Sequence, residues 1–293
     1  MAVAGLTSVV VVSHRSLATL PDCLAAVLAS TAPVEVIAVD NGSDDGSAAL
    51  LAGLAGGEPR LRVIANADNR GFGAACNQGA QQANGDALLL LNPDAFVPVD
   101  ALARLRTVLG LDPTIGLLGC SVVDAGGRPH GPQRRREPTW RRSLMSLTGL
   151  ARLERRWPAL AGVERPPPAT MTTVIEAVDA VNGALMLLPT GLFRSLGGFD
   201  EGFRLHAEDL DLCRRVRAAG RTVAIAPAIA VRHIGGVSGR RRPLWVEWQK
   251  TRSMWRYFRK HQPASGLPVR SVVALGLGLR LLLRAPLLLL RRR

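Results

Sequence analysis

Several short groups of polar residues in this sequence have the composition of ligand-binding or catalytic sites. Asp40 ends the apolar run Val34–Val39 and opens the stretch Asp-Asn-Gly-Ser-Asp-Asp-Gly-Ser. Asp94 closes Asn-Pro-Asp directly after the apolar run Ala87–Leu91. A carboxylate at such a position can accept hydrogen bonds from a ligand or bind a hard divalent metal ion that bridges a diphosphate. Ordinary turns are the alternative for both acids, because Asp and Asn are common there.

Two glycine-containing groups suggest contacts with phosphate or metal. Residues 69–79 read Asn-Arg-Gly-Phe-Gly-Ala-Ala-Cys-Asn-Gln-Gly, and glycines just before a helix allow a phosphate to approach backbone amides. A dinucleotide fingerprint is excluded, because Cys76 stands where G-x-G-x-x-G requires glycine. His233 opens His-Ile-Gly-Gly-Val-Ser after a predicted strand. A lone histidine in such a place is more often structural than a ligand.

Acidic residues crowd the start of one predicted helix, which spans residues 208–219. Glu208, Asp209 and Asp211 lie close behind His206. The helix dipole favours acids at this end, but three of them beside a histidine exceed what a helix cap needs. The crowding makes this helix start a candidate site.

The elements that must position these groups follow from apolar periodicity. Buried strands are predicted at Val9–Val12, Val34–Val39, Arg62–Ala65, Ala87–Leu91, Val178–Leu188, Val223–Ile225 and Ala228–Val231, and helices at Leu20–Ser30, Gly73–Ala83 and Glu208–Ala219. Strands that alternate with helices imply βαβ units and a largely parallel sheet. In such sheets ligands bind beyond the carboxyl ends of the strands, where Asp40 and Asp94 are expected. Residues 125–170 are predicted to be a long irregular excursion that faces an acceptor or moves.

The use of lysine and cysteine excludes several classes of protein. Lys250 and Lys260 are the only lysines, so 35 of the 37 basic residues are arginine. The absence of lysine before residue 250 excludes a P-loop NTPase, a kinase of the usual pattern and a Schiff-base enzyme with its lysine in the main domain. The four cysteines form no CxxC, which excludes the usual zinc-finger spacings and suggests buried thiols in a reducing compartment.

Charge is distributed unevenly along the 293 residues. Residues 1–130 carry a net charge of −5 and residues 131–293 a net charge of +19, and residues 234–293 hold 14 basic residues and one acid. This asymmetry predicts a catalytic domain followed by a segment that meets an anionic surface, either membrane or nucleic acid. The arginines at 134–136 and at 141–142 either contact an acceptor diphosphate or belong to a solvated loop.

The last segment, residues 267–293, consists mostly of Leu, Val, Ala and Arg. Arg280, Arg284 and Pro286 interrupt its apolar run, so a membrane-spanning helix is not expected. An interfacial helix whose arginines reach lipid phosphates fits the pattern. The alternative is an ordinary terminal helix that packs on the domain or on a partner chain.

Taken in order and spacing, these groups resemble the inverting nucleotide-sugar glycosyltransferases of the GT-A fold, a family that includes bacterial rhamnosyltransferases and galactofuranosyltransferases. The resemblance runs from about Ser8 to Ser238, and its most specific part is G-F-D-E-x-F-x-x-x-x-E-D-x-D-L-C-x-R. It implies an α/β fold with a mostly parallel, Rossmann-like sheet. We expect this GT-A domain at residues 1–240 and a basic amphipathic helical segment at residues 241–293.

The resemblance also implies a nucleotide-sugar site. Asp40 would bind the pyrimidine base of the donor. Asn69, Gly71 and Asn77 would flank the nucleotide. Asp94 would be the surviving carboxylate of a D-x-D-type metal motif that contacts the donor diphosphate.

The remaining implied roles concern the metal and the acceptor. His233 would be a second ligand of Mn²⁺ or Mg²⁺, and Asn92 in place of the first acid of the metal motif predicts modest metal affinity. Asp209 would be the catalytic base, and Glu208 beside it would assist or bind the acceptor. His206 stands where an aromatic residue, often Tyr, is common, which bears on donor or acceptor choice.

The function expected from the resemblance is transfer of one sugar, with rhamnose from dTDP-rhamnose as the favoured donor and a UDP-sugar as the alternative. The acceptor would be a lipid-linked glycan or polysaccharide in cell-envelope synthesis, and the enzyme would be cytoplasmic and peripheral on the inner face of the cell membrane. Two other functions stay open, a non-catalytic nucleotide-sugar-binding protein of the same fold and a basic nucleic-acid-binding protein. The 4% aromatic content disfavours nucleic acid, so no nucleic-acid partner is expected.

Overall fold

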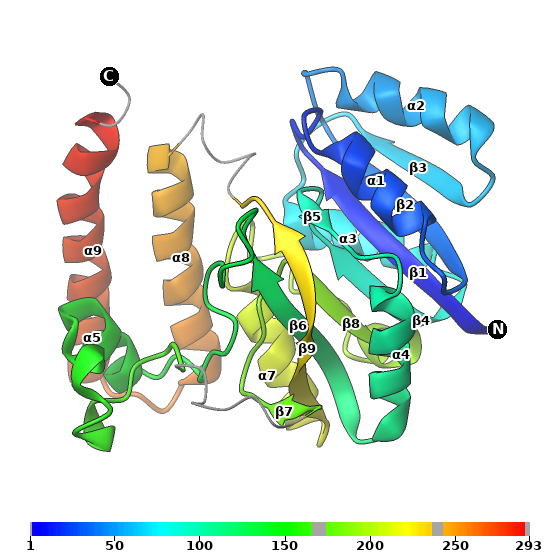
Figure 1. Ribbon diagram of the computed structural model, residues 1–293. Helices are drawn as coiled ribbons and strands as arrows, with labels where there is room; N and C mark the ends of the chain where they lie inside the picture. Colours follow the sequence, from blue (N-terminus) through cyan, green and yellow to red (C-terminus); the bar gives the residue numbers. More distant parts are fainter. Residues whose placement is uncertain (1, 166–173, 236–242, 291–293) are drawn as a thin grey trace.

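The computed structural model describes residues 2–165, 174–235 and 243–290 (Figure 1). Within these ranges nine strands form one sheet in the order β3-β2-β1-β4-β8-β6-β9-β5, and β7 also pairs with β9. The strands are β1 Val3–Ser13, β2 Val34–Asn41, β3 Leu61–Asn66, β4 Gly85–Leu91, β5 Ala95–Phe96, β6 Ile115–Val123, β7 Glu176–Ala177, β8 Leu185–Pro189 and β9 Thr222–His233. The helices are α1 Leu20–Leu28, α2 Ser47–Gly57, α3 Phe72–Gln81, α4 Ala101–Leu111, α5 Trp140–Thr148, α6 Thr190–Ser195, α7 Glu208–Ala218, α8 Pro243–His261 and α9 Leu267–Leu290, with short 3₁₀ turns η1 Leu150–Leu153 and η2 Pro158–Leu160.

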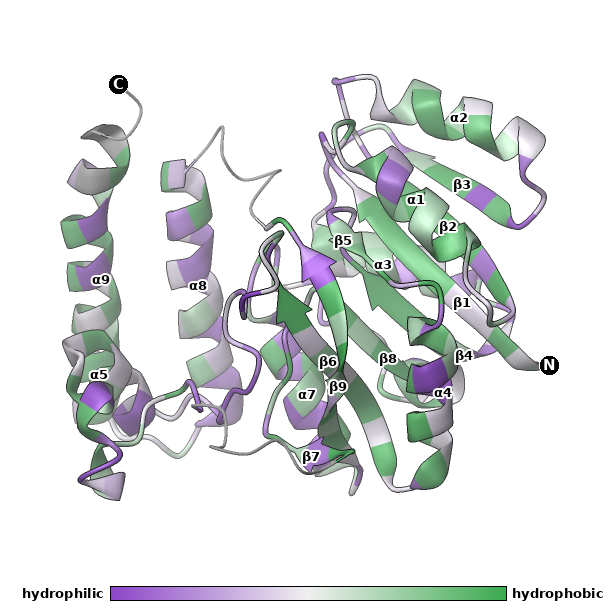
Figure 2. Ribbon diagram, in the orientation of Figure 1, coloured by the Kyte–Doolittle hydropathy of each residue, from purple (hydrophilic) through white to green (hydrophobic). Residues whose placement is uncertain are grey.

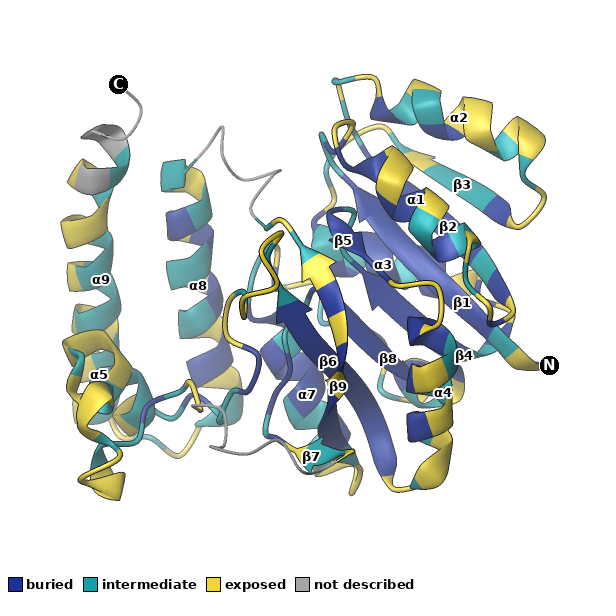
Figure 3. Ribbon diagram, in the orientation of Figure 1, coloured by how far each residue is buried: buried dark blue, intermediate teal, exposed yellow. Residues whose placement is uncertain are grey.

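The first half of the sheet is parallel, as the βαβ pattern predicted. β1 pairs in parallel with β2 and with β4, and β2 pairs in parallel with β3. Their apolar runs are buried on both faces (Figure 3), as expected for strands covered by helices on both sides. Ser13 is level with Asp40, and Val11 is level with Leu91. The carboxyl ends of these strands therefore form one edge, which carries Asp40 and, just beyond β4, Asp94.

The second half of the sheet is mixed, which the sequence did not indicate. β8 is antiparallel to both β4 and β6, whereas β6 is parallel to β9. The strand expected over Val178–Leu188 was wrong at its start, because regular pairing begins only at Leu185; residues 178–184 are irregular, with an isolated bridge at Ala180 and a turn at 183–184. The two strands expected between 223 and 231 are one strand, β9, with a register shift opposite Cys120.

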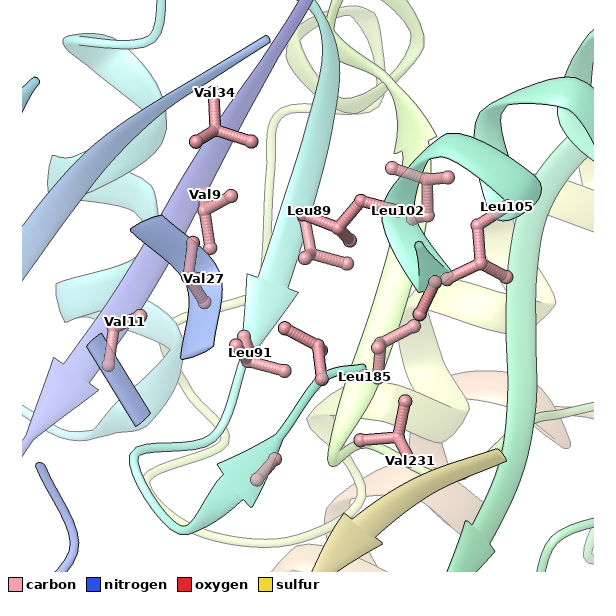
Figure 4. Packing of buried hydrophobic residues seen from close by; sticks show 14 of the residues in the cluster. Val9, Val11, Val27, Val34, Leu89, Leu91, Leu102, Leu105, Leu185 and Val231 are labelled. Atoms are coloured by element: carbon pink, nitrogen blue, oxygen red, sulfur yellow. The ribbon is translucent and has the colours of Figure 1, made fainter. Parts of the chain in front are cut away.

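Alternate side chains of the central strands build an apolar cluster on each face of the sheet. On one face Val9 and Val11 pack with Val27 of α1 and Leu102 of α4 (Figure 4). The other cluster joins the opposite side chains of β1 to α3, α7 and the aromatic ring of Phe203. The hydropathy colouring shows that the central strands are largely apolar (Figure 2). The core thus fixes the orientation of α7, whose first turn carries the acid pair.

Residues 241–293 do not form one uniform tail. α8 belongs to the core of the domain, because Tyr257 and Phe258 are buried and Tyr257 joins the second apolar cluster. α9 packs on α8 and lies farther from the sheet (Figure 1). We therefore propose that the catalytic unit extends to the end of α8 at His261. Within the described residues, no helix has the length and apolar content needed to cross a membrane.

A buried carboxylate joins α7 to α8. Asp211 is fully buried and accepts bonds from Arg215 at 2.7 Å, Lys260 at 2.7 Å and His261 at 2.8 Å. Burial raises the pKa of Asp211, but the bonds from His261, Lys260 and Arg215 outweigh it and lower the pKa to about 2. Lys260 also reaches Asp200 at 2.7 Å. The helix that sequence analysis assigned to the tail thus holds both ends of the segment 200–211.

Replacing Asp211 by Asn should destabilise the fold by about 3 kcal/mol at neutral pH, because Arg215 and Lys260 lose the buried carboxylate that pairs with them. The lowered pKa means that the carboxylate stabilises the fold fully above its ordinary value near 3.9, and that about 2 kcal/mol is lost as the pH falls towards 2. Urea unfolding at neutral and at acid pH measures both effects. Asp100→Asn, at an exposed ion pair, is the control and should change stability by at most about 0.5 kcal/mol. Equal unfolding midpoints for Asp211→Asn and the wild type at neutral pH would contradict the assignment.

Candidate functional site

Asp40 lies at the edge of the sheet formed by the carboxyl ends of the parallel strands, and one of its two carboxylate oxygens is available to a ligand. Its side chain is buried, and Oδ2 accepts a hydrogen bond from the Ser43 amide at 3.0 Å. Its Oδ1 and the neighbouring Ser13 Oγ are buried and have no hydrogen-bond partner within the described residues. Buried polar atoms are rarely left unpaired. This pair of atoms is therefore suited to accept and donate hydrogen bonds to a ligand at the ends of β1 and β2.

A network of amides shapes the loop that follows β3. Asn41 donates to Asn69 Oδ1 and to the Gly71 carbonyl, both at 3.2 Å, and its own oxygen accepts from the Arg70 amide at 3.1 Å. Asn69 Oδ1 also accepts from the Gly71 amide at 2.9 Å. Asn69 and Gly71 thus lie beside Asp40. Sequence reasoning missed Asn41, which follows Asp40 directly and holds the loop in place.

Gly42 allows the Asp40 turn and the Asn69 loop to touch. Its φ is +73°, and a Cβ added there would lie 2.7 Å from the backbone carbon of Asp68. Gly42→Ala should therefore cost about 1–3 kcal/mol and weaken donor binding by displacing Asp40. Thermal unfolding and calorimetric titration with dTDP or UDP measure the two effects. Gly127→Ala has a similar φ of +75° and open space, so it should leave nucleotide affinity unchanged. Equal affinity in the Gly42 variant would contradict this close packing.

Asn77 has a different environment from the other predicted nucleotide-binding residues. Its amide bonds the backbone of Phe199 in both directions, at 2.8 and 3.0 Å, and donates to Glu201 at 3.0 Å. A Cβ at Gly198 would clash with it. These contacts occupy both ends of the amide. We therefore propose that Asn77 positions the segment before the acid pair rather than contacting the nucleotide.

Asp94 and His233, which are 139 residues apart, meet at the end of β4. β5 pairs with β9 so that Ala95 is level with His233, and the His233 Nε2 lies 3.0 Å from the Asp94 Oδ1. Asn92 Nδ2 approaches the same nitrogen at 3.3 Å. The ring of His130 packs edge-on against His233 at 5.6 Å. The predicted pairing of Asp94 with His233 thus has a geometric basis.

The donor set at Asp94 and His233 fits a divalent cation. One carboxylate oxygen and one imidazole nitrogen suit Mn²⁺ or Mg²⁺, which take their remaining ligands from phosphate and water. Within the described ranges no group of three or more His, Cys, Asp or Glu side chains is placed to hold a metal. Asp94 and His233 are thus the two such side chains that the described residues bring together here, and a donor diphosphate would supply further ligands. The motif residues Gly236 and Ser238 lie outside the described residues.

Glu208 and Asp209 open α7 behind a strained bend. His206 and Ala207 both have a φ of +66°, which is costly for residues with a side chain and is common at functional sites. Ser253 of α8 supports the bend through a 2.8 Å hydrogen bond to the Leu205 carbonyl. Burial lowers the pKa of His206 to about 4. This histidine, which replaces the usual aromatic residue, is therefore neutral near pH 7.

The two acids have different surroundings. Glu208 is buried, its Oε2 has no hydrogen-bond partner within the described residues, and burial together with Asp209 raises its pKa to about 8. Asp209 is partly exposed, and its Oδ1 accepts a 2.8 Å hydrogen bond from the Leu210 amide. Asp209 Oδ2 forms an ion pair with Arg135. A neutral carboxyl and a charge-paired carboxylate thus stand side by side, an arrangement typical of proton-transfer sites.

Arg135 was not predicted to lie here. It belongs to the irregular excursion, but only 13% of its side chain is exposed, its backbone pairs with that of Ala180 in both directions, and its side chain donates to the Val181 carbonyl. Arg134 is buried and forms a 2.6 Å ion pair with Glu176. The solvated-loop interpretation is therefore wrong for these two arginines. The run of arginines in the sequence does not indicate which carboxylates these side chains pair with.

A short turn connects the acid pair to the metal-ligand pair. A Cβ at Gly183 would lie 3.1 Å from Asp209 Oδ2. The carbonyl of the next residue, Ala184, accepts a 3.0 Å hydrogen bond from the Asn92 amide in the Asn-Pro-Asp turn. Glycine thus lets the helix that carries Asp209 come close to the end of β4. The arrangement places the Asp209 carboxylate near the Asp94–His233 pair.

Comparison with known proteins identifies the family of the chain. The family model described as glycosyl transferase family 2 matches residues 8–165, more than half of the chain. The chain belongs to glycosyl transferase family 2. It is therefore an enzyme of nucleotide-sugar transfer. The acid pair and His233 lie beyond the matched residues.

A curated relative of this family 2 glycosyltransferase is the N-acetylglucosaminyl-diphospho-decaprenol L-rhamnosyltransferase of Mycobacterium tuberculosis. The two are 27% identical over 217 residues, which cover 70% of this chain and 68% of the relative. Because the aligned stretch is longer than the part that the family model matches, the similarity extends beyond residues 8–165.

Solved structures confirm the GT-A fold of the transferase. GalNAc-T7 with UDP, GalNAc and Mn²⁺ matches with a TM-score of 0.62 and 18% identity over 92% of this chain, which spans about half (54%) of that structure. The mannosyltransferase PcManGT from Pyrobaculum calidifontis, in complex with GDP-Man and Mn²⁺, matches with a TM-score of 0.60 and 19% identity over 92% of this chain and 69% of that one. Both of those structures contain Mn²⁺.

Proposed function

We propose that this glycosyltransferase transfers one sugar, with inversion at the anomeric carbon, from a dTDP- or UDP-sugar to a lipid-linked or polysaccharide acceptor in cell-envelope glycan synthesis. The observation that carries the proposal is the placement of the Asp94–His233 pair and Asp209 on either side of the turn at Gly183. A donor bound at one side would present its anomeric carbon towards the base on the other.

The donor side would be formed by the edge of the parallel strands. Asp40 and Ser13 would bind the pyrimidine base through their unpaired oxygens, and Asn69 and Gly71 would border the nucleotide. Asp94 and His233 would hold Mn²⁺ or Mg²⁺, which neutralises charge on the departing nucleoside diphosphate when bound. The two structural neighbours solved with Mn²⁺ support this cofactor.

The acceptor side would be formed by the start of α7. Asp209 would take the proton of the acceptor hydroxyl as that oxygen bonds to the anomeric carbon. The bond from this carbon to the diphosphate oxygen breaks in the same step, and the leaving oxygen keeps the electron pair. Arg135 would hold the Asp209 carboxylate in position. Glu208, protonated at neutral pH, would donate a hydrogen bond to the acceptor. Alignment of hydroxyl and donor carbon supplies much of the remaining acceleration.

The name of the M. tuberculosis relative supports rhamnose as the first sugar to test and a polyprenyl-diphosphate glycan as the acceptor class. Such an acceptor is held in a membrane, which agrees with the strongly basic second half of the chain. We therefore propose a cytoplasmic enzyme that works peripherally at the inner, anionic face of the cell membrane.

Release of nucleoside diphosphate from a panel of dTDP-, UDP- and GDP-sugars tests the proposal. The assay is run with Mn²⁺, Mg²⁺ or EDTA, and with or without a membrane lipid extract. We expect metal-dependent release from one pyrimidine donor, stimulated by the lipid extract. Absence of release together with absence of donor binding in calorimetry would overturn the proposal.

A further inference from the structure

The outward side of α9 carries an apolar stripe that no other described residue covers. Leu275, Leu279 and Leu282 are 72%, 58% and 71% exposed, and their i, i+4, i+7 spacing puts them on one side of the helix. Exposed leucines are unremarkable one at a time, but a contiguous row marks a surface that binds something apolar.

The other side of α9 is anchored to the domain, so the stripe has a fixed orientation. Arg280 pairs with Glu247 of α8 at 2.6 Å, and Arg284 approaches the same carboxylate at 3.5 Å. A Cβ at Gly276 would lie 4.0 Å from Leu147, at the end of α5. Arg280, one of the arginines that sequence analysis assigned to lipid phosphates, therefore points towards α8, whereas Arg284 stays 56% exposed. The leucines form the outward side.

The segment that touches α9 continues the apolar surface. Leu147, Leu150, Leu153 and Trp157 are each at least 40% exposed. Exposed arginines at 152, 155 and 156 lie between them. Figure 1 shows α5 beside α9, with α8 between α9 and the sheet. Leucine and tryptophan interspersed with arginine is the composition of segments that lie in a lipid headgroup region.

We propose that the exposed leucines of α9 and the exposed apolar residues of segment 147–157, together the α5–α9 face, dock on the surface of an anionic lipid bilayer. This inference rests on the proposed function, because it gives a lipid-linked acceptor its point of entry. The excursion that contains segment 147–157 also carries Arg135, which contacts Asp209. One continuous stretch of chain therefore runs from the docking face to the acid pair.

The charge of the α5–α9 face favours an anionic bilayer over a second copy of the chain as its binding partner. The exposed arginines of this face are Arg152, Arg155 and Arg156, and the acids nearby, Glu154 and Glu247, are already paired with Arg136 and Arg280. A two-fold contact would place two such basic faces against each other, and like charges repel. An anionic headgroup layer complements the arginines, while the leucines enter the acyl boundary.

Vesicle co-sedimentation of the full chain tests the proposal, with vesicles of equal parts phosphatidylglycerol and phosphatidylcholine beside vesicles of phosphatidylcholine alone. We expect binding to the anionic vesicles that weakens with salt. The combined variant Leu275→Glu, Leu279→Glu, Leu282→Glu should lose at least about tenfold in binding. Leu54→Glu and Leu111→Glu, at exposed leucines of α2 and α4, should bind as the wild type does.

A second variant keeps the test independent of how the leucine variant folds. Neutralising the exposed arginines, with Arg152→Gln, Arg155→Gln and Arg156→Gln, should reduce binding to anionic vesicles severalfold at low salt without lowering the melting temperature. Undiminished binding of both variants would overturn the proposal, as would equal binding of the wild type to neutral and anionic vesicles. A dimer in solution that the leucine substitutions dissociate would assign the face to self-association instead.

Transfer to a water-soluble acceptor analogue separates this inference from the proposed function. If the wild type transferred sugar to the soluble analogue but did not bind vesicles, only the proposal of a docking face would be overturned. Loss of vesicle binding with unchanged transfer to the soluble analogue, in the leucine variant, is the result that supports it. Failure of donor turnover with every acceptor would overturn the proposed function, whatever the vesicles show.

Discussion

Asp209→Asn should lower kcat by about 10²- to 10⁴-fold, the usual contribution of a general base, and leave the KM for the donor nearly unchanged. The amide keeps the size of the side chain and still accepts a hydrogen bond from the Leu210 amide. It cannot take a proton from the acceptor hydroxyl, and it loses the ion pair with Arg135. An equal fall in kcat and in kcat/KM is the pattern expected for an interaction made only in the transition state.

Initial-rate measurements with a fixed acceptor and varied donor give both constants. Asp22→Asn, at an exposed position of α1, is the matched control and should leave kcat unchanged. Glu208→Gln should cost less than Asp209→Asn, because a glutamine amide can still donate a hydrogen bond to an acceptor. If Glu208→Gln abolished turnover while Asp209→Asn retained it, the two acids would exchange roles. A wild-type rate in both variants would refute the base assignment.

Asp94→Ala and His233→Ala should each weaken metal-dependent donor binding by about 100-fold or more. Each removes one of the two ligands that the described residues offer. Replacing a residue that only hydrogen-bonds to a metal ligand already lowers metal affinity 10- to 100-fold. Calorimetric titration of the nucleoside diphosphate in the presence and absence of Mn²⁺ reports this without relying on turnover. The metal should lose its effect on affinity in both variants.

His130→Ala separates metal ligation from packing at the same place. His130 contacts the ring of His233 edge-on but is not one of the proposed ligands. Its loss should leave the effect of Mn²⁺ on nucleotide affinity within a fewfold of wild type. If His130→Ala abolished the metal effect and Asp94→Ala did not, the ligand assignment would be wrong.

The parallel half of the fold was predictable because its signals are local. The runs of β1 and β4 are continuously apolar, and that of β2 is broken only by Glu35. The helices α3 and α7 were expected within two residues of their observed ends, and the edge that carries Asp40 follows from parallel pairing. Neither β6 nor α4 was predicted, although β6 is buried along almost its whole length. The antiparallel direction of its neighbour β8 depends on how the chain returns to the sheet, and no local sequence pattern indicates this.

The contacts within the site were less predictable than its residues. The residues Asp94, His233 and Asp209 could be singled out by type and order, through resemblance to a family. Their distances depend on the pairing of β5 with β9 and on the turn at Gly183. The Arg135 ion pair joins positions 74 residues apart, and a run of arginines does not specify its partners. Long-range contacts of this kind are decided by packing rather than by the local sequence.

The excursion between β6 and β7 has a consequence for how such an enzyme can diversify. The strands at its two ends, β6 and β7, both pair with β9, and the backbone bonds of Arg135 with Ala180 close its base. A segment tied at its base can change in length and composition at small entropic cost. Asp40, Asp94 and the strands that carry them lie outside it. Apart from Arg135, which pairs with Asp209, the excursion can therefore vary among related enzymes without altering the residues that we propose to bind the nucleotide.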